Sequence, residues 1–176
     1  ASLFGCFACF GNINFDGNTV YLDEQLKKRL DFMPGEVYDQ EKFNKNLFGN
    51  EDQSDALSLY MDNGYLDARF EPKEKKITSD SIDIDISVFE NQRYKIARID
   101  IVGNTKTKDK VIRRELYTRP GDYFDRSAII RSIRALGVLN YFNQESLKPD
   151  VQPSTTDKNT VNITYKVEER STDQIN

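Results

Sequence analysis

Histidine and tryptophan are absent from this chain of 176 residues, and cysteine occurs only twice. Without histidine there is no Ser-His-Asp or Cys-His catalytic set, and no zinc site that needs an imidazole ligand. Both cysteines lie in one apolar motif, Cys6-Phe7-Ala8-Cys9, with no neighbouring base to favour a thiolate. We therefore expect this motif to pack or to be a foreign terminal segment, and we expect neither a metal nor a cofactor.

Long apolar runs are also missing. The longest, Leu3 to Phe10, has eight residues, whereas a membrane-spanning helix needs about 20. A basic segment followed by a small-residue cleavage site, typical of a secretory signal, is missing too, as it would be in a mature fragment. The composition, 38% hydrophobic and 31% charged, indicates a globular chain rather than a disordered one.

What the sequence does contain is a repeat with a spacing of 86 residues. Three turn or cap signals recur in this register: Gly17-Asn18-Thr19 as Gly103-Asn104-Thr105, Pro34-Gly35 as Pro120-Gly121, and Tyr38-Asp39 as Phe124-Asp125. Signals repeated in one register predict two copies of one small domain. We place the copies at residues 1–91 and 92–176. The junction, a short and stiff hinge, consists of Glu90, Asn91, Gln92 and Arg93.

Charge differs between the two copies. Residues 1–92 contain nine basic and 18 acidic residues, a net charge of −9, and the remainder carries +5. Opposite charges indicate mutual attraction or different partners, unless they only solvate the surface.

Hydrophobic periodicity predicts the order β-α-α-β-β in each copy. In the second copy we expect strands at 94–102, 141–147 and 161–167, a first helix capped by Thr107 and a second capped by Asp125. In the first copy we expect strands near 13–15, 65–71 and 82–88, and a second helix capped by Asp39. We also expect a charged hairpin loop at 72–81 and about ten inserted residues near 46–55. The predicted fold class is α+β, with a three-stranded mixed sheet in each copy and two helices covering one face.

These signals, in this order and found twice, resemble a POTRA (polypeptide-transport-associated) domain. In the second copy the resemblance rests on Arg113-Arg114-Glu115-Leu116, Pro120-Gly121-Asp122, Asn140-Tyr141-Phe142 and residues 161–169. In the first copy it rests on Gly17-Asn18, Pro34-Gly35, Gly64-Tyr65 and Val88-Phe89-Glu90. Residues 1–11 do not match, because Phe10-Gly11 stands where the second copy has Ile96-Ala97.

The end of the chain narrows the resemblance. Residues 167–172 are similar to the junction between the last POTRA domain and the barrel in the BamA family of outer-membrane barrel-assembly insertases, with Asp173 where that family often has glycine. The resemblance implies a periplasmic, non-catalytic binding module of an outer-membrane protein. The implied partners are unfolded outer-membrane proteins, assembly lipoproteins and a C-terminal membrane β-barrel of the parent chain, with no nucleic acid.

The same resemblance implies where clients bind, because in the family an extended client adds to the second strand of a domain. The implied edge residues are Leu66, Asp67, Ala68, Arg69, Phe70 and Glu71 in the first copy and Asn143, Gln144, Glu145 and Ser146 in the second. Their charges also fit an edge that is only protected against aggregation. A basic segment containing Lys110, Arg113 and Arg114 either docks an acidic partner or is a solvated helix face.

Other classes of protein remain open at this stage. A two-partner secretion transporter also carries POTRA domains. A small α+β nucleic-acid-binding protein is disfavoured by the acidic first copy and by the lack of a Gly-x-x-Gly backbone clamp. An enzyme is disfavoured because Asp83 and Asp85 alternate with isoleucines, which predicts the solvent face of a strand, and no nucleophile–base pair is visible.

Overall fold

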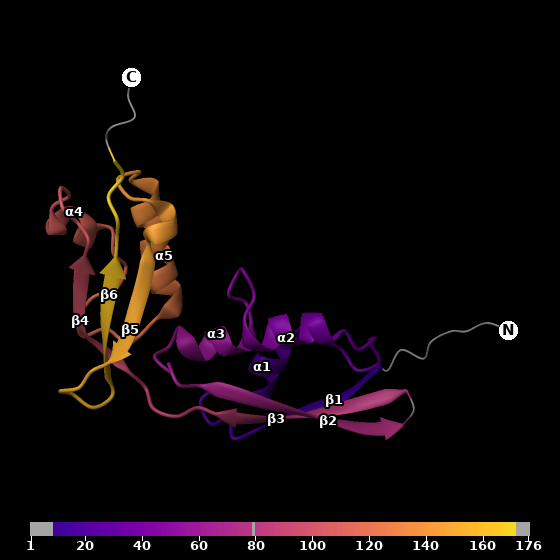
Figure 1. The fold of residues 1–176 in the computed structure, drawn as a ribbon. Coiled ribbons are helices and arrows are strands. Elements are labelled where there is room, and N and C mark those ends of the chain that lie inside the picture. Colours follow the sequence, from indigo (N-terminus) through magenta and orange to yellow (C-terminus); the bar gives the residue numbers. More distant parts are fainter. Residues whose placement is uncertain (1–8, 79, 172–176) are drawn as a thin grey trace. The chain divides into compact units, whose positions relative to one another are not determined.

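The computed structural model describes residues 9–78 and 80–171. Two compact units are formed, one by Ala1–Met61 with Asp67–Gln92 and the other by Asp62–Leu66 with Arg93–Asn176. Each unit contains a three-stranded sheet with helices packed on one face (Figure 1). Within the described residues, no helix combines the length and apolar character needed to cross a membrane.

The first unit is built from three strands and three helices. Its elements are β1 (Cys9–Asp16), α1 (Asp23–Leu30), α2 (Gln40–Phe48), α3 (Ala56–Met61), β2 (Arg69–Thr78) and β3 (Ser81–Phe89). The strand order is β1-β3-β2, with β1 parallel and β2 antiparallel to the central β3. Helix side chains pack on alternate residues of β3, and this core contains Leu26, Leu30, Phe43, Leu47, Tyr60, Ile84 and Ile86.

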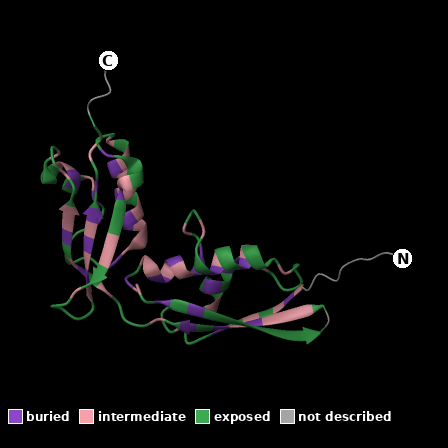
Figure 2. Ribbon diagram, in the orientation of Figure 1, coloured by how far each residue is buried: buried purple, intermediate pink, exposed green. Residues whose placement is uncertain are grey.

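The second unit repeats this topology. Its elements are β4 (Lys95–Val102), α4 (Asp109–Arg114), α5 (Arg126–Val138), the short 3-10 helix η1 (Gln144–Ser146), β5 (Lys148–Pro153) and β6 (Thr160–Lys166). The order β4-β6-β5 again joins one parallel and one antiparallel pair. Buried residues line one side of β6 (Figure 2), and the core contains Ile96, Ile112, Leu136, Phe142, Val161, Ile163 and Tyr165. The predicted α+β fold with mixed sheets is confirmed.

Two of the predicted helix caps are present and one is wrong. The Asp39 carboxylate accepts from the Lys42 amide at 3.0 Å, and the Asp125 carboxylate accepts from the Ala128 amide at 2.8 Å. Both satisfy a backbone donor that the first turn of a helix leaves free. Thr107 does not cap α4, because the cap position is Lys108 and the Thr107 side chain hydrogen-bonds Glu169 instead.

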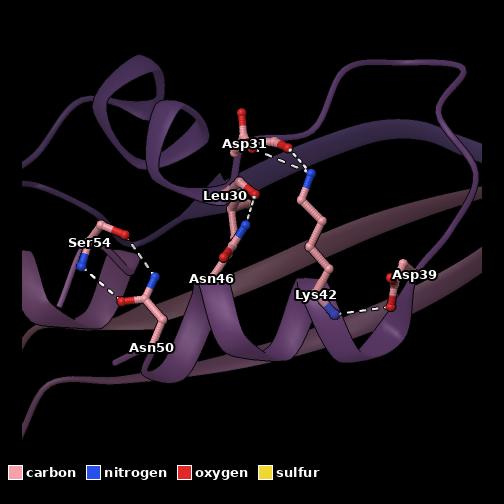
Figure 3. A network of polar contacts seen from close by, with 7 residues as sticks. All are labelled: Leu30, Asp31, Asp39, Lys42, Asn46, Asn50 and Ser54. Atoms are coloured by element: carbon pink, nitrogen blue, oxygen red, sulfur yellow. Dashed lines mark hydrogen bonds and ion pairs between the residues drawn. The ribbon is translucent and has the colours of Figure 1, made fainter. Parts of the chain in front are cut away.

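The predicted insertion in the first unit divides its second helix in two. Helix α2 ends at Phe48, and α3 begins at Ala56 after the loop 49–55. The fully buried Asp55 starts α3, since its carboxylate accepts from the Ser58 amide at 2.9 Å and from the Ser58 hydroxyl at 2.6 Å. Across the loop, Asn50 and Ser54 exchange two hydrogen bonds of 2.8 Å (Figure 3).

Helix α2 also closes the end of α1. Asp31 adopts a left-handed conformation with a φ of 54°, which leaves carbonyl groups of α1 without helical partners. The Lys42 ammonium donates to the Asp31 carbonyl at 2.9 Å. One turn later, the side-chain carboxamide of Asn46 donates to the Leu30 carbonyl at 2.7 Å (Figure 3). The two helices are thus joined by polar contacts as well as by their apolar faces.

The second strand of each unit is not where its sequence pattern placed it. Strand β2 covers 69–78 rather than 65–71, so most of the expected hairpin loop at 72–81 is strand. Strand β5 covers 148–153 rather than 141–147. Both strands lie at a sheet edge and contain proline, and only Phe70 is buried in β2. Charge and proline are typical of loops, but an edge strand tolerates both.

The first strand begins earlier than its sequence indicated. Phe10 pairs with Ile82 in β3 and is 2% exposed, as is Ile96 of β4, which pairs with Val161. Both strands shift register directly after this residue. Phe10 therefore occupies in the first unit the core position that Ile96 occupies in the second. The mismatch seen in the sequence is an exchange of one buried apolar side chain for another. Cys6 lies outside the described residues.

Candidate functional site

The repeated Gly-Asn-Thr turns hold each unit together. Gly17 and Gly103 have φ angles of 91° and 94°, and a Cβ at Gly103 would lie 1.9 Å from the Val167 carbonyl oxygen. Only glycine fits such a close approach in this conformation. In each turn the asparagine side chain donates to a carbonyl three residues on, from Asn18 to Tyr21 at 2.8 Å and from Asn104 to Thr107 at 3.0 Å.

A glutamate after the last strand of each unit fastens the same turn. The Glu90 carboxylate accepts from the Thr19 and Val20 amides at 2.8 and 2.9 Å and from the Tyr60 hydroxyl at 2.8 Å. Burial opposes ionisation of Glu90, but the hydrogen bonds outweigh it and hold the pKa below its ordinary value. The amides of Thr107 and Lys106 likewise lower the pKa of Glu169. The turns are therefore anchors, and the surfaces available for partners lie elsewhere.

One edge of each sheet is partly covered by its own chain. In the first unit the Phe10 amide donates to the Glu36 carbonyl and the Gly35 amide donates to the Phe10 carbonyl, both at 2.8 Å. The second unit repeats this, with the Ile96 amide on Asp122 at 2.8 Å and the Gly121 amide on Ile96 at 2.7 Å. The Pro-Gly loops thus pair with the beginnings of β1 and β4.

The opposite edges are β2 and β5, and the predicted client residues are only partly there. Arg69, Phe70 and Glu71 open β2, with Phe70 buried in the core. Asp67 and Ala68 precede the strand, and Leu66 belongs by its contacts to the second unit. The Asp67 carbonyl accepts from the side-chain carboxamide of Asn91 at 2.7 Å. The structure therefore brings half of the predicted first edge onto a strand.

The predicted edge in the second unit is wrong as a strand. Gln144, Glu145 and Ser146 form η1, and the Asn143 carboxamide caps it at the Glu145 amide, 3.3 Å away. A tight helical turn directs backbone groups inward along its own axis and offers no ladder to an added strand. The strand edge in this unit is β5, which begins after η1.

Sequence reasoning missed residues 72–78 as strand, although a signal was present. The third strand is nine residues long, Ser81–Phe89, and its alternation was clear in the sequence. A hairpin partner of similar length has to precede it, because an unpaired central strand would leave its backbone groups unsatisfied. The pairing runs from Arg69–Phe89 to Thr78–Ser81 and places Lys73, Lys75 and Lys76 on the edge.

The basic residues of α4 differ in how far their own unit engages them. The Arg113 guanidinium pairs with Asp109 at 2.5 Å and donates to the Ile99 carbonyl of β4 at 3.1 Å. Arg114 pairs with the adjacent Glu115 at 3.3 Å and is exposed, as is Lys110. Arg113 is thus tied to the sheet, whereas Lys110 and Arg114 offer charge to the surface.

The predicted hinge residues are divided between the units. Glu90 is held by Thr19, Val20 and Tyr60 of the first unit. Asn91 has a φ of 54° and bonds to Asp67 of the same unit. Arg93 belongs to the second unit, where it donates to the Asn63 carbonyl at 2.6 Å and lies 3.5 Å from the centre of the Tyr123 ring.

Comparison with known proteins gives a consistent family. The family described as "POTRA: Surface antigen variable number repeat" matches residues 9–91 and 94–170. A candidate outer membrane protein assembly factor of Treponema pallidum (strain Nichols) is 33% identical over 164 residues, which are 93% of this chain and 18% of the relative. BamA, the outer membrane protein assembly factor of Nitratidesulfovibrio vulgaris, is 31% identical over 166 residues, which are 92% of this chain and 20% of the relative. The chain thus spans about a fifth of the length of these relatives.

Solved structures share the fold. The crystal structure of Haemophilus influenzae BamA POTRA3-5 gives a TM-score of 0.76 at 16% identity, over 92% of this chain and 61% of that one. The structure of Haemophilus ducreyi BamA lacking POTRA domains 1-3 gives 0.74 at 23% identity, over 94% of this chain and 30% of that one.

Proposed function

Because the chain belongs to the POTRA family, we propose that it is a periplasmic protein-binding module of an outer-membrane protein assembly factor. Its relatives are named as assembly factors, which favours this role over that of a secretion transporter. The proposed clients are unfolded β-barrel precursors, and the proposed mode of binding is addition of an extended client segment to a sheet edge. We also propose that these are the last two such domains before a membrane barrel in the parent chain.

The observation that carries this proposal is the exposed edge of β2. The strand is ten residues long, pairs on one side with β3 and is exposed at nearly every residue (Figure 2). Backbone donors and acceptors along such an edge are unpaired, and an extended chain that adds to it bonds through main-chain groups common to every client. Each bond contributes about 1 kcal/mol net, so a short pairing is weak and reversible. Weak, sequence-tolerant binding suits a module that hands on many different clients.

Binding of an unfolded precursor tests the proposal. A dye-labelled, urea-unfolded β-barrel precursor is diluted into buffer with increasing amounts of the chain, and fluorescence anisotropy is recorded. We expect saturable binding in the micromolar range, typical of a short main-chain pairing, and similar affinity for a precursor fragment of scrambled sequence. Absence of binding up to about 1 mM chain would contradict the proposal.

A second surface is proposed to dock an acidic assembly lipoprotein. Lys110 and Arg114 are exposed on α4, whereas Arg113 is engaged with Asp109 and Ile99. The informative variant is therefore K110E/R114E in the full-length parent protein, with K158E as the control because Lys158 is exposed in the hairpin turn after β5. We expect the double variant alone to recover less lipoprotein in a pull-down. Equal recovery by all three proteins would remove this surface from the account.

A further inference from the structure

We propose that client addition is confined to β2 of the first unit and that the corresponding strand of the second unit, β5, is a closed edge. The inference rests on the proposed function and narrows it to one of four sheet edges. The other three edges are each obstructed in part by features of the chain itself. The beginnings of β1 and β4 are paired with the Pro-Gly loops, and the Ile99 carbonyl of β4 accepts from Arg113. The obstruction of β5 is its prolines.

The direction of each backbone group in the second sheet follows from its hydrogen bonds. Successive residues of a strand direct their backbone groups to opposite sides. The amide of Val167, the residue after β6, donates to the carbonyl of Val102 in β4. The backbone groups of odd-numbered residues of β6 therefore face β4, and those of even-numbered residues face β5. The bond from the Ser154 amide to the Thr160 carbonyl has the same parity. The residues of β5 that lie opposite even-numbered residues of β6, and whose backbone groups therefore hydrogen-bond to β6, are Lys148, Asp150 and Gln152.

The residues of β5 whose backbone N–H and C=O groups point away from β6, called outward residues below, are consequently Pro149, Val151 and Pro153. Proline has no backbone N–H, so two of these three positions have no donor to offer to a strand added from outside. Within β5, which the structure describes in full, the single outward donor is the Val151 amide. An incoming strand would find its carbonyls unpaired on both sides of that residue. The positions of the prolines thus protect the edge without breaking the pairing of β5 with β6.

The same parity leaves β2 open. The Cys9 amide of β1 donates to the carbonyl of Asp80, just before β3. The backbone groups of even-numbered residues of β3 therefore face β1, and those of odd-numbered residues face β2. The residues of β2 that lie opposite these odd-numbered residues, and hydrogen-bond to them through the backbone, include Arg69, Glu71, Lys73 and Lys75. The residues whose backbone groups point outward are Phe70, Pro72, Glu74 and Lys76, and all of these except Pro72 carry an N–H donor. The longer strand therefore offers three donors where β5 offers one.

The side chains of β2 define the partner more closely. The strand contains four basic and two acidic residues. Lys75 pairs with Asp85, and Glu74 accepts a hydrogen bond from the Tyr38 hydroxyl. The basic surplus, which includes the exposed Lys73 and Lys76, opposes pairing of two β2 edges from two copies of the chain. It favours an extended segment that carries carboxylates between its apolar residues, and this is the occupant we assign to β2.

A nuclear magnetic resonance titration with paired variants tests the assignment. The probe is a synthetic peptide of about 12 residues in which apolar residues alternate with aspartate and glutamate, a length that covers the strand. E74P removes a central outward donor, and Pro72 shows that the strand accepts proline in this orientation. E74A keeps the donor while losing the same carboxylate, and V151P removes the last outward donor of β5. Native-like amide shifts in β1, β3 and the helices of the first unit of E74P verify that the unit carrying the proline remains folded.

We expect peptide-induced shifts at residues 70–76 of the wild-type chain. E74P should weaken binding about fivefold or more, while E74A and V151P stay within about twofold. The double variant P149V/P153V should gain a second set of shifts in β5. A peptide with lysine in place of its acidic residues should bind about threefold more weakly.

The outcomes separate this inference from the proposed function. Wild-type binding that E74P leaves unchanged, or wild-type shifts centred on Val151, would overturn the edge assignment and leave client binding standing. Equal affinity for the acidic and lysine peptides would overturn the assigned occupant. If the wild-type chain binds neither peptide, client addition itself is contradicted, and the edge assignment falls with it.

Discussion

At the scale of single residues, the Gly-Asn-Thr turn is a point where the chain has almost no freedom. Gly103 combines a φ of 94° with a backbone carbonyl where a Cβ would lie, whereas Gly121 has a φ of 92° and open space around it. Both positions share the cost of a positive φ, but only Gly103 adds the cost of a steric overlap, so comparing them separates the two effects. Their alanine variants therefore measure what the close approach to Val167 contributes.

We expect G103A to be the more destabilised of the two. G121A should lower the free energy of unfolding by about 1 kcal/mol through backbone strain. G103A should lose about 3 kcal/mol, because the Val167 carbonyl must also move. Urea denaturation followed by circular dichroism measures both. Equal losses would show that the turn relaxes freely away from β6.

The glutamate that fastens the turn predicts a dependence of stability on pH. The pKa of Glu90 is lower in the folded chain than its ordinary value. Its contribution is therefore fully present above the unfolded pKa of about 4.3 and is lost as the pH falls through the folded pKa. E90Q should lower the free energy of unfolding by about 1 kcal/mol near neutral pH. The difference from the wild type should be constant from about pH 7 to about pH 5 and shrink as the pH falls further.

Denaturation curves over this pH range, with E51Q as an exposed control in the loop 49–55, provide the measurement. A difference between wild type and E90Q that stays constant with pH would contradict an anchoring role for the carboxylate.

How much the sequence reveals at this scale depends on the distance between partners. Asp39 and Asp125 were predictable as caps because a cap and the amide it accepts from are three residues apart. Glu90 and Glu169 were not predictable in their role, since each binds a turn that lies more than 60 residues earlier in the sequence. Thr107 was assigned as a cap for the same reason, because the competing acceptor on Glu169 is remote in sequence.

At the scale of elements, α3 depends on one buried carboxylate. Asp55 is fully buried and holds the first turn of α3 through the Ser58 amide and hydroxyl, and it accepts from the Asn50 amide across the loop at 3.3 Å. D55A removes the cap and leaves buried donors unsatisfied, so we expect a loss of about 2–3 kcal/mol. D52A, in an exposed position of the same loop, should leave the stability close to that of the wild type.

Thermal and urea unfolding of the two variants distinguish these effects. A loss from D52A as large as that from D55A would mean that the loop as a whole, and not the cap, supports α3.

Elements with a buried face were predictable, and the edge strands were not. Strands β3 and β6 alternate buried and exposed residues, and their period of two is visible in the sequence. Strands β2 and β5 bury few residues and contain Pro72, Pro149 and Pro153. Because few of their residues are buried, these strands show no alternation of apolar and polar residues in the sequence. Their prolines and charges are equally typical of loops. The part of the fold that sequence reasoning missed is the part proposed to meet partners or to exclude them.

At the scale of the whole molecule, duplication has produced two sheets with different edges. Both units keep the turn, the cap and the glutamate anchor, but β2 is long with three outward donors and β5 is short with two outward prolines. Client binding is thus proposed for the first unit, and a closed edge, together with the exposed charges on α4, for the second. One topology thus supports two roles through a few edge residues.

Backbone hydrogen exchange tests this central claim most directly. Amide exchange of the chain is followed residue by residue, with and without a saturating β-barrel precursor fragment. We expect slower exchange at the outward amides of Phe70, Glu74 and Lys76 on binding, and unchanged exchange at Val151. Protection centred on Val151, or protection of helix amides without any change along β2, would contradict it.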